Sequence, residues 1–235
     1  MKRHLILRFD APLVAFGGVA VDNYGVTDAW PSPSLLTGLL ANALGYRRIE
    51  AERLQDLQDR LVFACRCDRA GEALQDFQTA ELKKDDKGWT TRGAPEGRDG
   101  GAGTYVGKHI RYRDYWADRI VTVALRLAPE NAAPSLDDLG AALDRPARPL
   151  FIGRKPCLPA ARLLVGEQAA ETALAAVMAA AAVGGEDNSG RLFYWPAGEA
   201  APPMKGQRRV TAYGLRNWRS GVHGGTDHWY EGMEP

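Results

Sequence analysis

Leu61-Val62-Phe63-Ala64-Cys65 and Ile120-Val121-Thr122-Val123-Ala124-Leu125 are two apolar runs typical of β-strands, and a long polar stretch separates them. That stretch, Arg66 to Arg119, lacks the apolar content needed for a core. It contains a charged run, a glycine-rich run and a basic-aromatic run: Lys83 to Lys87, Gly97 to Gly107 and Lys108 to Trp116. A compact domain rarely carries so long a polar segment unless that segment is functional or disordered. We therefore predict an arm inserted between two core strands.

The composition is that of an ordinary globular protein, with 235 residues of which 45% are hydrophobic and 25% are charged. The net charge is +1, so any binding to nucleic acid must come from local patches. The three cysteines and the lack of a signal-peptide pattern predict a reducing, cytoplasmic location. The alanine-rich run Thr172 to Val183 is too short to span a bilayer, so we expect no membrane contact. No cysteine or histidine spacing indicates a metal site, and we expect no cofactor.

The order of predicted elements favours an α+β fold with a ferredoxin-like, or RRM-like, core over residues 1–153. Strands are predicted at Leu5 to Phe9, Leu61 to Cys67, Ile120 to Leu127 and Pro149 to Gly153. Helices are predicted after Ser32, over Ile49 to Arg60, and over Leu136 to Leu143 after Ser135. The sequence βαββαβ is typical of that fold. The amides at the start of the first helix are also a candidate phosphate site.

The arm is expected to occupy about residues 69–118, and its legs, Thr79 to Lys84 and Gly107 to Tyr115, are predicted to pair as a β-hairpin. Residues 154–235 are predicted to form a small C-terminal subdomain. It would contain a helix over Gln168 to Val183 and strands at Arg191 to Trp195 and Arg208 to Tyr213. The last dozen residues, rich in glycine, are expected to be a loose tail.

Three patches break the neutral charge balance. The first interleaves cations with aromatic residues: Lys108, Arg111, Arg113 and Arg119 with Tyr105, Tyr112, Tyr115 and Trp116. The second comprises Arg145, Arg148, Arg154, Lys155 and Arg162, and the third Lys205, Arg208, Arg209, Arg216 and Arg219. One such patch is commonly a solvated face, but three in one small protein support convergence on a single RNA-binding surface equally well. We predict phosphate contacts by Lys108, Arg111, Arg113, Arg148, Arg154, Lys155, Arg208 and Arg209, and base stacking by Tyr112 and Trp116.

The sequence offers few parts for catalysis, because it has no G-x-S-x-G motif and no cysteine in a recognisable catalytic setting. One alternative is metal-independent cleavage of RNA, in which a general base removes a 2′-hydroxyl proton and cations stabilise the phosphorane. Tyr46, Lys108 and His109 are the residues that would supply those parts. The simpler interpretation is that Lys108 binds a phosphate and His109 packs at the base of the hairpin. A third hypothesis is a scaffold without RNA contact.

Several stretches, through their order and spacing, resemble the CasD family, which binds the 5′ handle of the guide RNA in type I-E CRISPR Cascade complexes. These stretches are His4 to Phe9, Pro31 to Gly45, Phe63 to Asp68, Tyr112 to Tyr115, Val121 to Leu125 and Pro149 to Cys157. The last is the most specific.

The resemblance implies that the arm is a long β-hairpin thumb on an RRM-like core. It further implies a non-catalytic RNA-binding subunit of a type I CRISPR surveillance complex, holding the 5′ handle of the crRNA. The implied protein partners are a CasC-type backbone subunit and a CasA-type large subunit, with target DNA met only through the complex. Related type I-C subunits cut precursor RNA with a tyrosine, a lysine and a histidine. The endoribonuclease built on Tyr46, Lys108 and His109 therefore stays open as the alternative.

Overall fold

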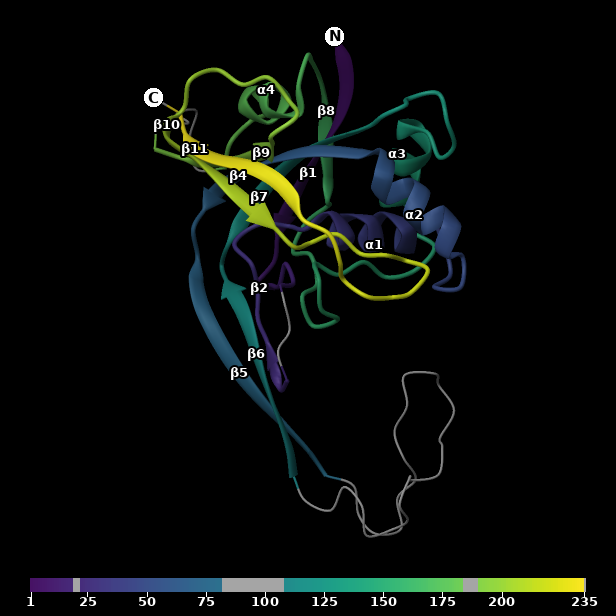
Figure 1. Cartoon of the computed structure of the whole chain (residues 1–235), viewed down its shortest axis with the longest axis vertical. Coiled ribbons are helices and arrows are strands. Elements are labelled where there is room, and N and C mark those ends of the chain that lie inside the picture. Colours follow the sequence, from purple (N-terminus) through teal and green to yellow (C-terminus); the bar gives the residue numbers. More distant parts are fainter. Residues whose placement is uncertain (19–21, 82–107, 184–189, 235) are drawn as a thin grey trace.

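The protein is of the α+β class and is built on one large antiparallel sheet (Figure 1). The computed structural model describes residues 1–18, 22–81, 108–183 and 190–234. The sheet has seven strands in the order β10-β11-β9-β4-β7-β1-β8. Their bounds are β1 (Lys2–Asp10), β4 (Leu61–Arg69), β7 (Ile120–Leu127), β8 (Leu164–Ala170), β9 (Leu192–Pro196), β10 (Lys205–Ala212) and β11 (Asp227–Met233).

A second, smaller sheet is organised around β6 (Lys108–Ala117). Along one side β6 pairs antiparallel with β5 (Glu72–Glu81), and it also pairs with the short strands β2 (Leu13–Val14) and β3 (Tyr24–Gly25). The β5–β6 pair lies between β4 and β7 in the chain and projects away from the large sheet (Figure 1). Its register joins Glu72 to Ala117 and Glu81 to Lys108. The expected glycine-rich tip lies outside the described residues.

Three helices cover one face of the large sheet and the fourth covers the other. α1 (Pro33–Ala43), α2 (Ala51–Arg60) and α3 (Leu136–Asp144) share a core with Leu5, Leu7 and Phe9 of β1. α4 (Ala173–Ala179) packs with Ile6, whose side chain points to the opposite face because side chains alternate along a strand. The predicted caps of α1 and α3 are confirmed, since Ser32 and Ser135 each accept a hydrogen bond from a first-turn amide.

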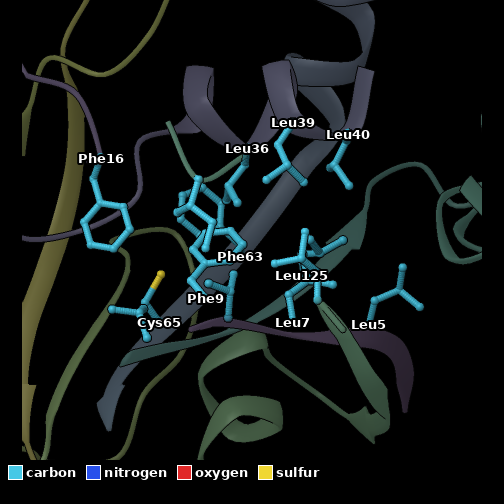
Figure 2. Close-up of a cluster of buried hydrophobic side chains, with 14 of the residues drawn as sticks. Leu5, Leu7, Phe9, Phe16, Leu36, Leu39, Leu40, Phe63, Cys65 and Leu125 are labelled. Carbon is cyan, nitrogen blue, oxygen red and sulfur yellow. The ribbon is translucent and has the colours of Figure 1, made fainter. Parts of the chain in front are cut away.

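The larger core holds α1 against the sheet. Figure 2 shows Leu36, Leu39 and Leu40 of α1 directed at side chains from β1, β4 and β7. Leu36 and Leu40 are fully buried, and each such side chain contributes about 1.5–3 kcal/mol of transfer free energy. The position of the α1 N-terminus, which matters for the site below, is therefore fixed by this core.

The strand expected at Pro149 to Gly153 is wrong, and the next strand of the large sheet after β7 is instead β8. Ile152 is fully buried, which explains the apolar run, but it sits in a loop. The Ile152 amide donates to the Cys157 carbonyl at 2.8 Å, and its carbonyl accepts from the Ala15 amide at 3.2 Å. The large sheet contains strands from both sides of residue 153, the boundary that the sequence suggested.

Two further predictions for the C-terminal part are corrected. The helix expected over Gln168 to Val183 begins only at Ala173, because the residues before it pair with β1 as β8. The expected loose tail contains β11, which pairs with both β10 and β9. Trp229 anchors it, since this side chain is 2% exposed and stacks on Tyr194 with ring centroids 4.5 Å apart. The strands expected near β9 and β10 are confirmed.

Candidate nucleic-acid interface

A cleft of about 1170 Å³ lies where the small sheet, the start of α1 and β10 meet. Its walls come from the Gly17-Gly18 loop, the two ends of α1, the 148–154 loop and the segment that follows β10. These pieces are distant in the sequence. The core in Figure 2 positions α1, and β11 positions β10, so the cleft depends on the complete fold.

The cleft is strongly basic although the whole chain is almost neutral. Seven arginines line it: Arg47, Arg48, Arg113, Arg148, Arg154, Arg208 and Arg216. The acids among the described lining residues are Asp28 and Glu231. Burial raises the pKa of Asp28, which favours its neutral form. The three basic patches of the sequence therefore each contribute at least one side chain to a single cavity.

Arg154 is a structural clamp within this cleft. Its guanidinium donates to the Asp114 carbonyl at 2.7 Å and to the Gly25 carbonyl at 2.6 Å. It also lies over the Tyr115 ring, with Cζ 4.8 Å from the centroid. These contacts tie the 148–154 loop to β6 and β3. The neighbouring Lys155 is exposed.

The guanidinium of Arg148 also donates hydrogen bonds to backbone carbonyls. Nη1 donates to the Tyr46 carbonyl and Nη2 to the Gly45 carbonyl, both at 2.9 Å. Both carbonyls lie just beyond Ala43, where α1 ends, so Arg148 ties its own loop to the turn that follows the helix. Its side chain is nonetheless exposed along the cleft.

The predicted residues of β6 divide between the two faces of the strand. Arg113 lines the cleft and donates from Nε to the Gln78 amide oxygen at 2.9 Å. Arg111 shares that face and is exposed. Tyr112 and Lys108 occupy the opposite face, with Lys108 at the far end of the pairing.

Trp116 is placed as a packing residue. Its indole N–H donates to the Asp28 carbonyl at 2.9 Å, and the Arg119 guanidinium covers the ring, 4.5 Å from its centroid. Burial lowers the pKa of Arg119. Tyr112 stacks on Tyr24 with centroids 4.9 Å apart and planes 12° apart. One ring face of each predicted stacking residue is thus already covered.

Strand β10 brings the third patch to the cleft. Arg208 forms an ion pair with Glu231 at 2.8 Å, yet its side chain is 73% exposed. Arg209 is exposed, but it does not line the cleft. Further along, Arg216 lies over the Trp218 ring at 5.1 Å. Burial and the nearby Arg48 lower the pKa of Arg216, and such like charges in proximity are typical of an anion site.

The helix amides are not the phosphate site that the sequence suggested. Pro33 has no N–H, the Ser34 amide donates to the Gly214 carbonyl, and the Leu35 amide donates to the Ser32 hydroxyl. The first-turn donors of α1 are therefore occupied within the protein.

Comparison with known proteins identifies the family. Residues 4–228 match the family described as CRISPR-associated protein (Cas_Cas5). The chain is also 30% identical, over 187 residues, to the CRISPR system Cascade subunit CasD of Escherichia coli (strain K12), covering 79% of this chain and 80% of that one. The chain belongs to the Cas5 family.

Two solved structures have a fold similar to that of this chain. One is from an assembly titled CRISPR RNA-guided surveillance complex, with a TM-score of 0.68, 21% identity, and coverage of 99% of this chain and 91% of that chain. The other is titled Crystal structure of Cas protein, with a TM-score of 0.64, 22% identity, and coverage of 99% and 95%.

The alternative catalytic set is not brought together in this Cas5 chain. Tyr46 lines the cleft just after α1, where the Arg53 guanidinium lies 3.7 Å from its ring centroid. Lys108 and His109 begin β6, at the end of the hairpin that points away from the large sheet (Figure 1). Neither Lys108 nor His109 is among the residues that line the cleft beside Tyr46.

Sequence reasoning missed Arg47, Arg48 and Tyr24. The adjacent arginines follow Gly45, just after α1 ends at Ala43, so their place after a helix terminus beside Tyr46 was the available signal. Nothing in the sequence pairs Tyr24 with Tyr112, because β3 is only two residues long.

Within residues 1–18, 22–81, 108–183 and 190–234, no group of three or more His, Cys, Asp or Glu side chains is arranged to hold a metal ion. Within the same residues, no helix is long and apolar enough to cross a membrane.

Proposed function

We propose that this Cas5 chain is the crRNA-binding subunit of a type I-E CRISPR Cascade complex, that it holds the 5′ handle of the guide RNA, and that it does so without catalysis. Its E. coli relative is a Cascade subunit by name. The single observation that carries the proposal is the cleft, where seven arginines face two acids. Such a concentration of arginine suits a phosphate backbone, because the guanidinium matches phosphate geometry and stays charged.

The geometry divides the arginines by task. Arg148 and Arg154 hold backbone carbonyls and shape the cleft, so we assign them a positioning role with phosphate contact secondary. Arg48, Arg113 and Arg216 lie along the cavity, and none of them has an ion-pair partner among the described residues. These three are the principal proposed phosphate ligands. Lys108, Arg111, Lys155 and Arg209 are exposed outside the cavity and would contact flanking nucleotides.

We also propose a ferredoxin-like, RRM-like core in which β1, α1–α2, β4, β7, α3 and β8 follow in chain order. The adjacent strands β4-β7-β1-β8 support it. The β5–β6 pair would then be the thumb, within about residues 69–118, and β9 to β11 the C-terminal addition that widens the sheet. A thumb that projects from the core suits contact with a CasC-type backbone subunit, and we place a CasA-type large subunit nearby. Target DNA would be met only through this cytoplasmic complex.

The test uses the full-length chain assembled with its partner subunits and a repeat RNA, in EDTA. The expected result is RNA retention that weakens steeply with salt, without cleavage. RNA retention that does not change with salt concentration would favour a scaffold. A complete lack of RNA retention would favour it as well.

The endoribonuclease alternative receives no support from the placement of Tyr46, Lys108 and His109. The same assay still decides it. Metal-independent cleavage that His109→Ala abolishes, while RNA retention persists, would overturn the non-catalytic assignment.

A further inference from the structure

Three aromatic side chains form one row across the small sheet. In the pairing register, Phe77 of β5 lies opposite Tyr112 of β6, and Tyr112 lies opposite Tyr24 of β3. Residues directly opposite each other on paired strands point to the same face. The row therefore stands on the face opposite Arg113, and two of its members are well exposed, Tyr24 by 48% and Phe77 by 62%.

The stacked pair of Tyr24 and Tyr112 lies at the edge of the small sheet. Their centroids are 4.9 Å apart and their planes differ by 12°. Neighbouring strands are spaced by about 4.7–4.9 Å, so these rings stack along the direction that runs from strand to strand. Among the described strands, β3 ends this side of the sheet. A further flat ring can extend the stack on the outer face of Tyr24.

Positive charge lies directly beside this edge. Gly25 follows Tyr24 and has no side chain, so the Arg154 guanidinium reaches its carbonyl at 2.6 Å. A Cβ at Gly25 would stand 3.0 Å from Arg154 Nη2 and 3.8 Å from Arg113 Nη1. Both arginines line the basic cleft. The edge of β3 thus separates an aromatic stack on one face from the guanidinium groups of Arg113 and Arg154 on the other.

We propose that the outer face of Tyr24 stacks on one nucleobase of the bound single-stranded RNA, with Tyr112 as the supporting ring. The adjoining phosphates would lie in the cleft by Arg113. Aromatic rings beside cations are the composition by which proteins hold single strands. The assignment rests on the proposed RNA binding and replaces Tyr112 by Tyr24 as the residue that meets the base.

Phe77 gives an internal control and represents the competing use of this face. It is exposed and aromatic on the same face, but in the register it stands across Tyr112 from Tyr24, away from Gly25 and the Arg154 guanidinium that reaches it. The nearby exposed Ile110 makes that end of the face apolar, which would suit a protein surface. The Tyr24 end combines a flat stack with adjacent cations, so there we favour the nucleobase.

The test measures RNA affinity of the assembled complex for Tyr24→Leu, Tyr24→Phe and Phe77→Leu, using handle RNAs that carry 2-aminopurine at successive positions. Tyr24→Leu is expected to raise the Kd on the order of tenfold, because base–aromatic stacking contributes that much per base. It should also abolish the fluorescence quenching at one position. Tyr24→Phe should keep the wild-type Kd and the fluorescence quenching. Phe77→Leu should leave the Kd and the quenching unchanged.

Unchanged Kd and quenching in Tyr24→Leu would overturn the assignment. So would a loss of subunit assembly in Tyr24→Leu without RNA, which would make this face a protein contact. Absence of RNA binding by the wild-type complex would instead refute the proposed function itself.

Discussion

Gly153 lies so close to Ala15 that a Cβ at residue 153 would stand 1.6 Å from the Ala15 carbonyl oxygen. Gly153 also has a φ of +90°, a conformation that residues with a side chain rarely adopt. This contact fixes the 148–154 loop, and with it Arg154, beside the segment that leads into the cleft.

We expect Gly153→Ala to lower the free energy of unfolding by at least about 3 kcal/mol, because backbone strain and a backbone clash add together. Urea denaturation measures this loss. Gly166→Ala is the matched control, since a Cβ there meets nothing within 4 Å. If both variants unfold at the same urea concentration, Gly153 does not approach Ala15 this closely in the folded protein.

Arg66 holds the end of α4 from inside the protein. It is fully buried, pairs with Asp68 at 2.6 Å, and donates to the carbonyls of Val177 and Ala180 at 2.8 Å each. Arg66→Met removes the nearest cation of the buried Asp68, since Arg191 stands farther away at 3.6 Å, and leaves the α4 carbonyls without their donor. It should therefore cost about 3–5 kcal/mol of unfolding free energy.

The control for Arg66 is the exposed pair between Arg162 and Asp144. Arg162→Met should cost less than about 1 kcal/mol, because solvent screens exposed pairs. Denaturation curves of the two variants compare these effects directly. Equal losses would show that Asp68 finds other compensation.

His4 should make stability depend on pH. Its side chain is fully buried, and this burial lowers its pKa below the ordinary 6.5. The unfolded chain then binds the proton more readily than the folded chain. The contribution of His4 to the free energy of unfolding is therefore fully present above about pH 6.5. It is lost as the pH drops toward the pKa of His4 in the folded chain.

We expect His4→Leu to flatten the pH dependence of the melting temperature just below pH 6.5, relative to the wild type. The exposed His228 supplies the control variant His228→Gln. A slope in His4→Leu as steep as that of the wild type would contradict the effect.

Arg48 and Arg216 should act together on RNA. Both line the cleft, and burial together with the like charge of Arg48 lowers the pKa of Arg216. Replacing both with glutamine should weaken RNA retention and make the plot of log K against log salt shallower by about 1.4, since each lost phosphate contact removes about 0.7. Arg145→Gln is the control, an exposed arginine outside the cleft. An unchanged slope in the double variant would remove these residues from the interface.

Local signals in the sequence predicted the elements that local physics determines. Ser32 and Ser135 mark helix starts because the cap bond joins residues three apart. The strands at Leu61 and Ile120 follow from their apolar runs. The pattern failed where distant partners decided the outcome: the loop that holds Ile152 is bound by the Ala15 amide, and Trp229 stacks on Tyr194.

The candidate site was likewise predicted only in part from the sequence. Composition located the three basic patches, but it cannot distinguish an arginine that binds phosphate from one that binds carbonyls. Arg154 differs from Arg113 only through the carbonyls of Asp114 and Gly25 that the fold places within its reach. Tyr24 was missed because its importance comes from one pairing with β6.

The position of β11 between β9 and β10 bears on the order of biosynthesis. A ribosome makes β10 before β11, yet β10 joins the sheet only through β11. Arg208 of β10 therefore cannot take its place in the cleft until residues 227–233 have left the exit tunnel. A nascent chain that has already folded β1 through β9 would still lack one wall of the cleft, because β10 has no strand of this sheet to pair with until β11 is in place.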